Sequence, residues 1–402
     1  MLSVEEAAGR ILAAFSRLDP EPTSILESLG LLLAEDVVAT FDIPPLANSA
    51  MDGYAVRSED VRGAGPESPR RLRIIADVAA GYVSDSRVTE GVAIRIMTGA
   101  PVPEGADAVV QVELTEREND DVLVLAETAH LRNIRPSGED VRAGQTVLRS
   151  GALIRPPEVG VLASLGRRSA LCVRRPRVGV LATGDELVEP GERLAPGQIY
   201  NANAYSTAAQ VLEAGGVPVM LGIARDTRDS LSITLQAALA QGVDMLITSG
   251  GVSVGDFDLV KDMLAAQGEI DFWQVNMKPG KPLAFGKISG VPMIGLPGNP
   301  VSAIVSFELF GRPAIHTMLG LPPKPRPTAT ARLLDHYQKT DDRRHFVRVI
   351  VEQRNGENVA RLTGEQGSGI LTSLTAANAL AVIPENAPDV RVGESVELWL
   401  LG

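Results

Sequence analysis

The region from residue 177 to residue 319 alternates between short apolar runs and longer segments with helical spacing. The runs RVGVLATG, VPVMLGI and DMLITSGG predict buried strands, and the segments 204–214, 230–241, 257–266 and 301–319 predict helices. IDFWQV predicts a further strand, and KPLAFGKISGVPMIGLPG predicts a hairpin. Strands that alternate with helices are typical of a mainly parallel, doubly wound α/β sheet.

The patterns on either side of this region are different. Apolar residues at helical intervals predict helices over residues 3–18 and 24–29. From residue 42 to 135, the runs RLRIIADV, VAIRIMTG, ADAVVQVEL and DDVLVLAE predict short strands separated by glycine turns. The proline-rich passage LPPKPRPTA predicts a linker, and β-like runs follow it.

These patterns predict a multidomain protein of the α/β plus β class. We expect a discontinuous linker domain with helical and β elements at residues 1–41 plus 137–172, and a small β-rich domain at 42–136. The central α/β domain is expected at 173–321, and a C-terminal β-barrel-like domain at 322–402.

Charge and composition exclude several classes of function. The 402 residues include 50 acidic and 38 basic side chains, and the net charge of −12 repels the phosphate backbone of nucleic acids. The single cysteine, Cys172, excludes a disulfide framework and a zinc site of several thiolates. No apolar run approaches the ~20 residues that span a bilayer, so we expect a cytoplasmic protein without membrane or nucleic-acid partners.

Lysine is unusually clustered along the chain. Only six of the 38 basic residues are lysines, and four of these lie between residues 261 and 287. Lys278 and Lys281 belong to the loop KPGKP, which is stiffened by its prolines. We expect this loop to present two cations near the carboxyl edge of the sheet; a solvated surface loop is the alternative.

The loops after the predicted parallel strands carry the candidate chemistry, because ligands bind beyond the carboxyl ends of such strands. In the loop TGDEL, Gly184 lets the backbone approach a ligand, and the acids Asp185 and Glu186 can face a cation or an exchangeable proton. The alternative is a loop that only begins a helix, with Asp185 as its cap.

Two further loops have the features of anion sites. In SGGVSVGDFD, the backbone N–H groups from Gly250 to Ser253 form a cradle for phosphate or another oxyanion. Asp256 and Asp258 fit such a site if Mg²⁺ bridges carboxylate and phosphate. In LPGNPVS, a cap at Asn299 and a proline in the first helical turn also point free N–H groups at an anion.

Together, these segments resemble the molybdopterin molybdenumtransferase family, which includes the bacterial MoeA proteins and the E domain of gephyrin. The motifs NSAMDGYAV, RIMTGAPVP, TGDEL, SGGVSVGDFD, KPGKP and LPGNPVSA occur in the family's order and spacing. GSGILTSL and NALAVIPE match the family's final domain, so the resemblance covers nearly the whole chain. The chain departs from the pattern at Leu46-Ala47, where many members carry a Phe-Asp pair.

The resemblance implies an elongated homodimer of four-domain subunits, with each active site between the central domain of one subunit and N-terminal loops of its partner. It implies that molybdate is inserted into adenylylated molybdopterin, with Mg²⁺-dependent cleavage of the adenylate and release of AMP and molybdenum cofactor. A molybdopterin adenylyltransferase would act upstream and supply the substrate.

The family's motifs also imply roles for individual residues. Asp52, Glu186 and Asp258 are the candidate catalytic residues, and Mg²⁺ is expected on Glu186, Asp226 and Asp258. The candidate substrate-binding residues are Ser49, Thr98, Asp140, Thr183, Gly184, Asp185, Gly250, Gly251, Val252, Ser253, Lys278, Lys281, Pro297, Asn299, Pro300 and Ser302.

Two other functions stay open. The α/β region alone also resembles the molybdopterin adenylyltransferases, but these are little more than that single domain, so the flanking domains weigh against this activity. A gephyrin-like scaffold or binding protein is the second alternative, and the acids of the candidate site favour catalysis over it. A classical hydrolase is not supported, because the chain has no GxSxG elbow.

Overall fold

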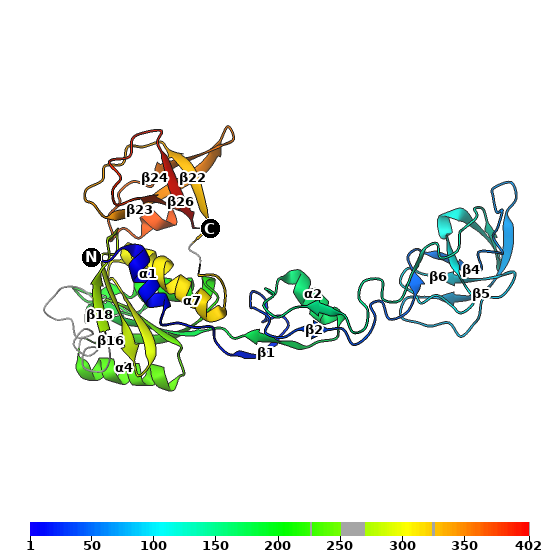
Figure 1. Cartoon of the computed structure of the whole chain (residues 1–402), viewed down its shortest axis with the longest axis horizontal. Helices are drawn as coiled ribbons and strands as arrows, with labels where there is room; N and C mark the ends of the chain where they lie inside the picture. Colours follow the sequence, from blue (N-terminus) through cyan, green and yellow to red (C-terminus); the bar gives the residue numbers. More distant parts are fainter. Residues whose placement is uncertain (226, 251–269, 324–325, 402) are drawn as a thin grey trace. The chain divides into compact units, whose positions relative to one another are not determined.

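The computed structural model describes residues 1–225, 227–250, 270–323 and 326–401 (Figure 1). The chain forms two compact units. The first consists of Met1–Glu21, Gly30–Leu32 and Cys172–Gly402, and the second of Pro22–Leu29 and Leu33–Leu171. The domain boundaries expected at residues 41, 136, 172 and 321 stay predictions.

A six-stranded sheet forms the centre of the α/β domain in the first unit, with the strand order β16-β13-β17-β21-β20-β18. The first four strands are mutually parallel; they are β16 (Val217–Ala224), β13 (Arg177–Thr183), β17 (Met245–Ser249) and β21 (Val291–Leu296). The last two, β20 (Pro282–Ile288) and β18 (Ile270–Gln274), are antiparallel to their neighbours. The predicted doubly wound, mainly parallel sheet is therefore confirmed, and so is the hairpin of β20 and β21.

Helices flank this sheet. α3 (Ala202–Glu213) packs against β13 and β16. α4 (Arg228–Ala240) contributes Leu231 and Leu235 to a core that also contains Leu181 and Leu246. The short strands β14 (Leu187–Val188) and β15 (Ile199–Tyr200) pair in parallel between β13 and α3. Together these elements place the end of β13 next to the start of α3.

The N-terminal helix α1 (Val4–Leu12) is shorter than the predicted segment. It begins with a capping box, in which Ser3 Oγ accepts from the Glu6 backbone N–H and the Glu6 carboxylate accepts from the Ser3 N–H. Its buried face packs against α7 (Arg312–Leu319). The helix predicted at residues 24–29 is wrong: these residues form the end of β1 (Pro20–Ser24) and turns, because so short a segment does not repay helix nucleation.

The helix predicted at 301–319 is interrupted. α6 (Pro300–Ser306) continues into a π-helical segment, η2 (Phe307–Gly311), and then into α7. Pro313 lies just after the π turn, and because it has no N–H group it cannot form the i to i−4 bond of a regular α-helix. The helix predicted at 257–266 lies outside the described residues.

The C-terminal domain is a closed five-stranded barrel. Its strands pair around a ring in the order β22-β24-β23-β25-β26 and back to β22. They are β22 (Thr328–Leu333), β24 (Glu357–Leu362), β23 (Arg344–Arg354), β25 (Ala379–Ile383) and β26 (Ser395–Leu400), with the one-turn helix α8 (Thr372–Thr375) before β25. This confirms the expected barrel-like domain. The two-residue strand β19 (Met277–Lys278) of the α/β domain pairs with the start of β23.

The second unit contains a separate six-stranded sheet with the order β7-β4-β6-β5-β9-β8. Its elements are β4 (Gly53–Val56), β5 (Arg70–Val78), β6 (Val92–Ile96), β7 (Ala108–Gln111), the 3-10 turn η1 (Val112–Leu114), β8 (Thr115–Glu118) and β9 (Asp121–Val124). The remaining elements are β2 (Val37–Val38), β3 (Asn48–Ser49), β10 (Ile134–Arg135), β11 (Thr146–Leu148), α2 (Pro156–Ser164) and β12 (Ser169–Val173). No helix in the described ranges has both the length and the apolar character needed to cross a bilayer.

Candidate functional site

The carboxyl ends of β13, β17 and β21 lie side by side, because these strands are parallel neighbours in the sheet. A hollow of about 120 Å³ lies at these ends. The residues that line it are Thr183, Glu186, Leu187, Ile199, Tyr200, Asn201, Ala202, Asn203, Ser249, Gly250, Gly298 and Pro300. The structure thus brings together four of the predicted site residues, namely Thr183, Glu186, Gly250 and Pro300.

Two glycines allow the loops to approach each other closely here. Gly250 has a φ of 89°, and a Cβ atom on it would lie 2.9 Å from the carbonyl oxygen of Thr183. Gly184 has a φ of 146°, and a Cβ atom on it would overlap the carboxylate of Glu186. Any other residue at either position would therefore displace a residue of the hollow and strain the backbone.

The hollow contains oxygen atoms that the protein itself leaves available. The hydroxyl of Thr183 is buried and has no hydrogen-bond partner among the described residues. Such an unsatisfied group costs about 1–3 kcal/mol, so it is a good candidate for contact with a ligand. The carboxylate of Glu186 makes no ion pair within the described ranges. This donor set of hydroxyl and carboxylate oxygens suits a hard cation such as Mg²⁺.

The third predicted loop closes another side of the hollow. The side-chain amide of Asn203 donates to the carbonyl oxygen of Gly298 at 2.8 Å and ties this loop to the start of α3. Asn299 occupies the N-cap position of α6, as expected, but its side chain makes no capping hydrogen bond. Pro297 and Ser302 are buried. They lie close in sequence to Gly298 and Pro300, which line the hollow, but do not line it themselves.

Sequence reasoning missed the contribution of residues 199–203. Asn201 caps α3, with its Oδ1 accepting from the backbone N–H of Ala204 at 3.3 Å. Asn203 faces the loop that contains Gly298. The available signal was the pair of asparagines immediately before the helix predicted at 204–214, since such residues mark helix starts.

The two loop lysines lie elsewhere, and neither lines the hollow. The ammonium group of Lys278 donates to Thr340 Oγ1 at 2.5 Å and lies 3.7 Å from the carboxylate of Asp341. Lys281 is half-buried, and its backbone carbonyl accepts from the Val275 N–H at 2.8 Å. Substrate binding by either lysine stays a prediction.

The remaining described candidates belong to the second unit. Asp52 accepts two hydrogen bonds from Thr98, at 2.7 Å from its backbone N–H and 2.8 Å from its hydroxyl. These bonds hold the pKa of Asp52 below its usual range. Ser49 is buried and donates to the Met51 carbonyl at 2.6 Å, whereas Asp140 is exposed.

Several predicted residues lie outside the described ranges. They are Asp226, Gly251, Val252, Ser253 and Asp258, together with Asp256. Two of the three predicted metal ligands are therefore untested. Within the described ranges no three His, Cys, Asp or Glu side chains come close enough to hold a metal ion. Asp185 is exposed, and its carbonyl oxygen accepts from Arg225 Nη1 at 3.1 Å.

Family comparisons cover nearly the entire chain. The MoeA N-terminal region (domain I and II) matches residues 2–166, and a probable molybdopterin binding domain matches residues 179–317. The MoeA C-terminal region (domain IV) matches residues 330–401. All three thus occur in one chain and in this order.

Full-length relatives agree with these matches. Molybdopterin molybdenumtransferase 2 of Mycobacterium tuberculosis is 39% identical over 99% of both chains. The molybdopterin molybdenumtransferase of Bacillus subtilis is 36% identical over 100% of this chain and 94% of its own length. A crystal structure of the molybdopterin biosynthesis MoeA protein from Pyrococcus horikosii has a TM-score of 0.81 at 32% identity, covering 100% of this chain and 99% of that one. The chain belongs to the molybdopterin molybdenumtransferase (MoeA) family.

Proposed function

We propose that this protein is a molybdopterin molybdenumtransferase of molybdenum cofactor biosynthesis. The observation that carries the proposal is the match over nearly the full length to relatives with this name. In the proposed reaction, molybdate is inserted into adenylylated molybdopterin, the adenylate is cleaved, and AMP and molybdenum cofactor are released.

The hollow at the strand ends is the proposed site for one polar group of this substrate. Its volume of about 120 Å³ is below the ~300–1,000 Å³ typical of sites that enclose a whole small molecule. It therefore suits a phosphate-sized group, while the rest of the substrate extends over neighbouring loops. The hydroxyl of Thr183 has no partner in the part of the chain that the structure describes and can donate to such a group, and Gly250 lets the group approach the backbone.

Glu186, Asp226 and Asp258 are the proposed holders of Mg²⁺. The carboxylate of Glu186 beside the unsatisfied hydroxyl of Thr183 supports this assignment, because both offer oxygen atoms. When bound, Mg²⁺ would neutralise the charge that develops on the phosphate. Lys278 and Lys281 are the proposed contacts for the anionic substrate or molybdate.

We further propose a cytoplasmic homodimer with its active sites between subunits. In this arrangement the hollow of one subunit faces the partner subunit's Ser49, Asp52, Thr98 and Asp140. Support comes from the family resemblance and from the polar pair of Asp52 and Thr98, whose hydrogen bonds keep a carboxylate ionised in an exposed loop. A separate molybdopterin adenylyltransferase would supply the substrate.

Release of AMP from adenylylated molybdopterin is the decisive assay. AMP release should require both molybdate and Mg²⁺, and Glu186→Gln should lower its rate, because a carboxylate oxygen is replaced by a weaker ligand. Glu192→Gln is a matched control on the same segment, because Glu192 is exposed and lies outside the residues that line the hollow. Formation of the adenylate from ATP and molybdopterin, without molybdate, would instead indicate an adenylyltransferase. Binding without turnover would indicate a scaffold.

A mixed-dimer experiment tests the shared site. Asp52→Ala and Glu186→Gln should each be nearly inactive as homodimers. A heterodimer of the two contains one site with both natural residues only if each site is built from two subunits, so it should regain about half the wild-type activity. Heterodimers without activity would contradict the intersubunit arrangement and leave the proposed reaction untouched.

A further inference from the structure

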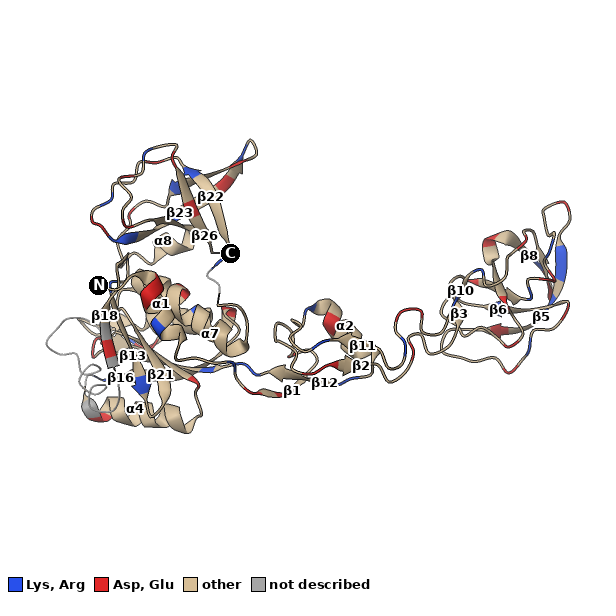
Figure 2. Ribbon diagram, in the orientation of Figure 1, with Lys and Arg blue, Asp and Glu red and all other residues tan. Residues whose placement is uncertain are grey.

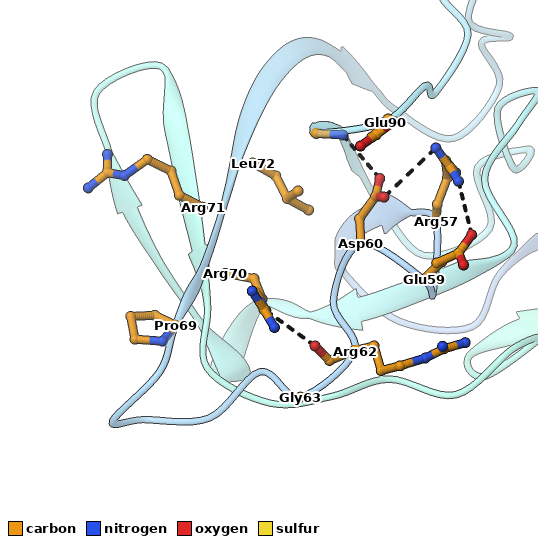
Figure 3. Close-up of a pocket in the computed structure, with 11 residues that line it drawn as sticks. Arg57, Glu59, Asp60, Arg62, Gly63, Pro69, Arg70, Arg71, Leu72 and Glu90 are labelled. Carbon is orange, nitrogen blue, oxygen red and sulfur yellow. Dashed lines mark hydrogen bonds and ion pairs between the residues drawn. The ribbon is translucent and has the colours of Figure 1, made fainter.

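A second, larger hollow lies in the six-stranded sheet domain of the second unit. It has a volume of about 1,000 Å³ (Figure 3). Its walls are the segment from Arg57 to Gly63, the start of β5 and the pair Glu90-Gly91. Only Pro69 and Leu72 among its eleven lining residues are apolar. A pocket of this composition suits a small, highly polar ligand rather than an apolar one.

Most of the charges around this hollow compensate each other. Arg57 lies 3.2 Å from the Glu59 carboxylate and 3.8 Å from that of Asp60. Asp60 also accepts from the backbone N–H of Gly91 at 3.1 Å, and its side chain is only 9% exposed. One guanidinium thus faces two carboxylates, and Figure 3 shows the wall that these contacts hold in place.

Two arginines are left without a carboxylate partner. Arg62 and Arg70 both line the hollow, and neither makes an ion pair with any residue in the described ranges. Arg70 Nε donates to the carbonyl oxygen of Arg62 at 3.2 Å, which joins the two segments. This bond orients the Arg70 guanidinium, whose terminal N–H groups make no hydrogen bond to the described residues and can form a planar, bidentate contact with an oxyanion.

The alternation of β5 explains why Arg70 faces the hollow. Side chains two positions apart lie on the same face of a strand, so Arg70 shares its face with the buried Leu72. Arg71 points to the opposite face, as Figure 3 shows, where it binds Glu118 at 2.5 Å and Asp121 at 3.0 Å. The basic start of β5 is visible in Figure 2. Arg73 follows Arg71 on that opposite face.

Glu90 is the remaining charged group of the hollow. Its carboxylate makes no ion pair within the described ranges, so it can accept hydrogen bonds from a ligand. Inorganic phosphate can reach this carboxylate only by bringing its own negative charge next to it, which is unfavourable. A phosphate attached to a hydroxyl-bearing group satisfies the arginines and Glu90 together.

We propose that this hollow binds a small phosphorylated, hydroxyl-bearing ligand. The phosphate lies on Arg62 and Arg70, and hydroxyl groups of the ligand donate to Glu90. The site is formed wholly by residues 57–91 and includes none of the residues assigned to molybdopterin chemistry. The proposal for this site can therefore be tested independently of the proposed enzymatic function.

Methyl NMR of the full-length protein tests this site with ribose 5-phosphate as the probe. The reporter is Leu72, whose side chain is only 2% exposed at the floor of the hollow. The Leu72 methyl signals should shift saturably during the titration, while those of Leu246, in the core of the α/β domain, should not follow the same curve. Binding of the probe at the strand ends of the α/β domain would leave Leu72 unchanged, and this outcome overturns the proposal.

Charge-removing variants distinguish a specific binding site from solvated arginines that attract anions only by their charge. Arg62→Gln and Arg70→Gln should each raise the dissociation constant about tenfold, because each removes a charge-assisted contact. Arg73→Gln, which removes the same charge from the opposite face of β5, should change the dissociation constant by less than about twofold. Equal weakening by all three variants would show only general electrostatics and would overturn the site.

Inorganic phosphate and ribose provide the last comparison. Ribose 5-phosphate should bind more tightly than phosphate, and Glu90→Gln should reduce the ratio of the two affinities. Ribose alone should produce no saturable shift of Leu72. Equal affinities for phosphate and ribose 5-phosphate in the wild type would refute the role of Glu90 and the ligand class.

Discussion

The ammonium group of Lys278 donates a hydrogen bond to Thr340 Oγ1 at 2.5 Å and lies 3.7 Å from the carboxylate of Asp341. Asp341 in turn binds Arg343 and the imidazole of His345. The hydrogen bond from Arg343, together with that from His345, holds the pKa of Asp341 far below its usual range. The C-terminal barrel thus holds a lysine of the α/β domain near a carboxylate whose pKa is lowered.

The first prediction concerns this contact. Thr340→Val removes the hydroxyl that accepts from Lys278 but keeps the shape of the side chain. If Lys278 contacts the substrate, the variant should raise KM several-fold with a small effect on kcat, because the charge is kept but held less firmly. Steady-state kinetics of AMP release check this. Asp342→Asn, at an exposed neighbouring position, is the control, and equal kinetics in both variants would contradict the positioning role.

The second prediction concerns Gly250. Gly250→Ala should abolish most activity, because its Cβ would lie 2.9 Å from the Thr183 carbonyl oxygen and distort the hollow. Gly290→Ala is the matched control: Gly290 has a similar φ of 85°, but no atom lies within 4 Å of its Cβ position. Both variants carry the strain of a positive φ, about 1 kcal/mol, so only the contact with Thr183 distinguishes them. Equal activities of the Gly250→Ala and Gly290→Ala variants would show that Gly250 is not part of the site.

The meeting of Thr183 with Gly250 could be predicted from the sequence. Thr183 ends one strand with a strong apolar pattern and Gly250 follows another, and neighbouring parallel strands end at the same edge of a sheet. The barrel-like character of the C-terminal domain could be anticipated, but its closure could not, because ring closure depends on the parallel pairing of β22 with β24. No local pattern specifies that register.

The environment of Lys278 could not be predicted in the same way. Its partner Thr340 lies 62 residues further along the chain, in a different domain. The contact requires β19 to pair with β23, and a strand of two residues has no recognisable periodicity. Likewise, the contact between Asn203 and Gly298 joins loops 95 residues apart. Long-range contacts of this kind decide which predicted residues actually meet.

The third prediction concerns Asp52 and Thr98. Thr98→Val removes the hydroxyl hydrogen bond to the carboxylate but keeps the one from the backbone N–H. The pKa of Asp52 should therefore rise part of the way toward its ordinary value, because one of two bonds that favour the ionised form is lost. Carboxyl ¹³C NMR measures this directly. Thr115→Val, whose hydroxyl donates to the Val112 carbonyl, is the control and should leave Asp52 unchanged.

The fourth prediction concerns a buried ion network. Glu308, only 1% exposed, accepts from Arg312 Nε at 2.6 Å and from Arg326 Nε at 2.8 Å. Arg326 also donates to the Leu401 carbonyl and so links the π-helical segment to the end of the barrel. Glu308→Gln leaves Arg312 and Arg326 with Glu213 as their one remaining carboxylate partner among the described residues, and it should lower the free energy of unfolding by about 3 kcal/mol. Denaturant unfolding measures this, and the exposed control Glu397→Gln should change it by less than about 0.5 kcal/mol.

The last prediction is the pH dependence of this network. Burial raises the pKa of Glu308, but the hydrogen bonds from Arg312 and Arg326 outweigh burial and hold the pKa below its ordinary value of 4.5. The unfolded state therefore binds the proton more tightly, and the network's contribution to stability is fully present above pH 4.5 and is lost as the pH falls through the lower folded value.

Other depressed carboxylates make the wild type acid-sensitive as well, so the informative quantity is the difference in unfolding free energy between wild type and Glu308→Gln. This difference should be constant between about pH 6 and 7 and should shrink toward about pH 3, because glutamine does not titrate. A difference that instead grows as the pH falls from about 7 to about 4 would mean that Glu308 is protonated in the folded protein, and the network would then be a neutral hydrogen-bonded one.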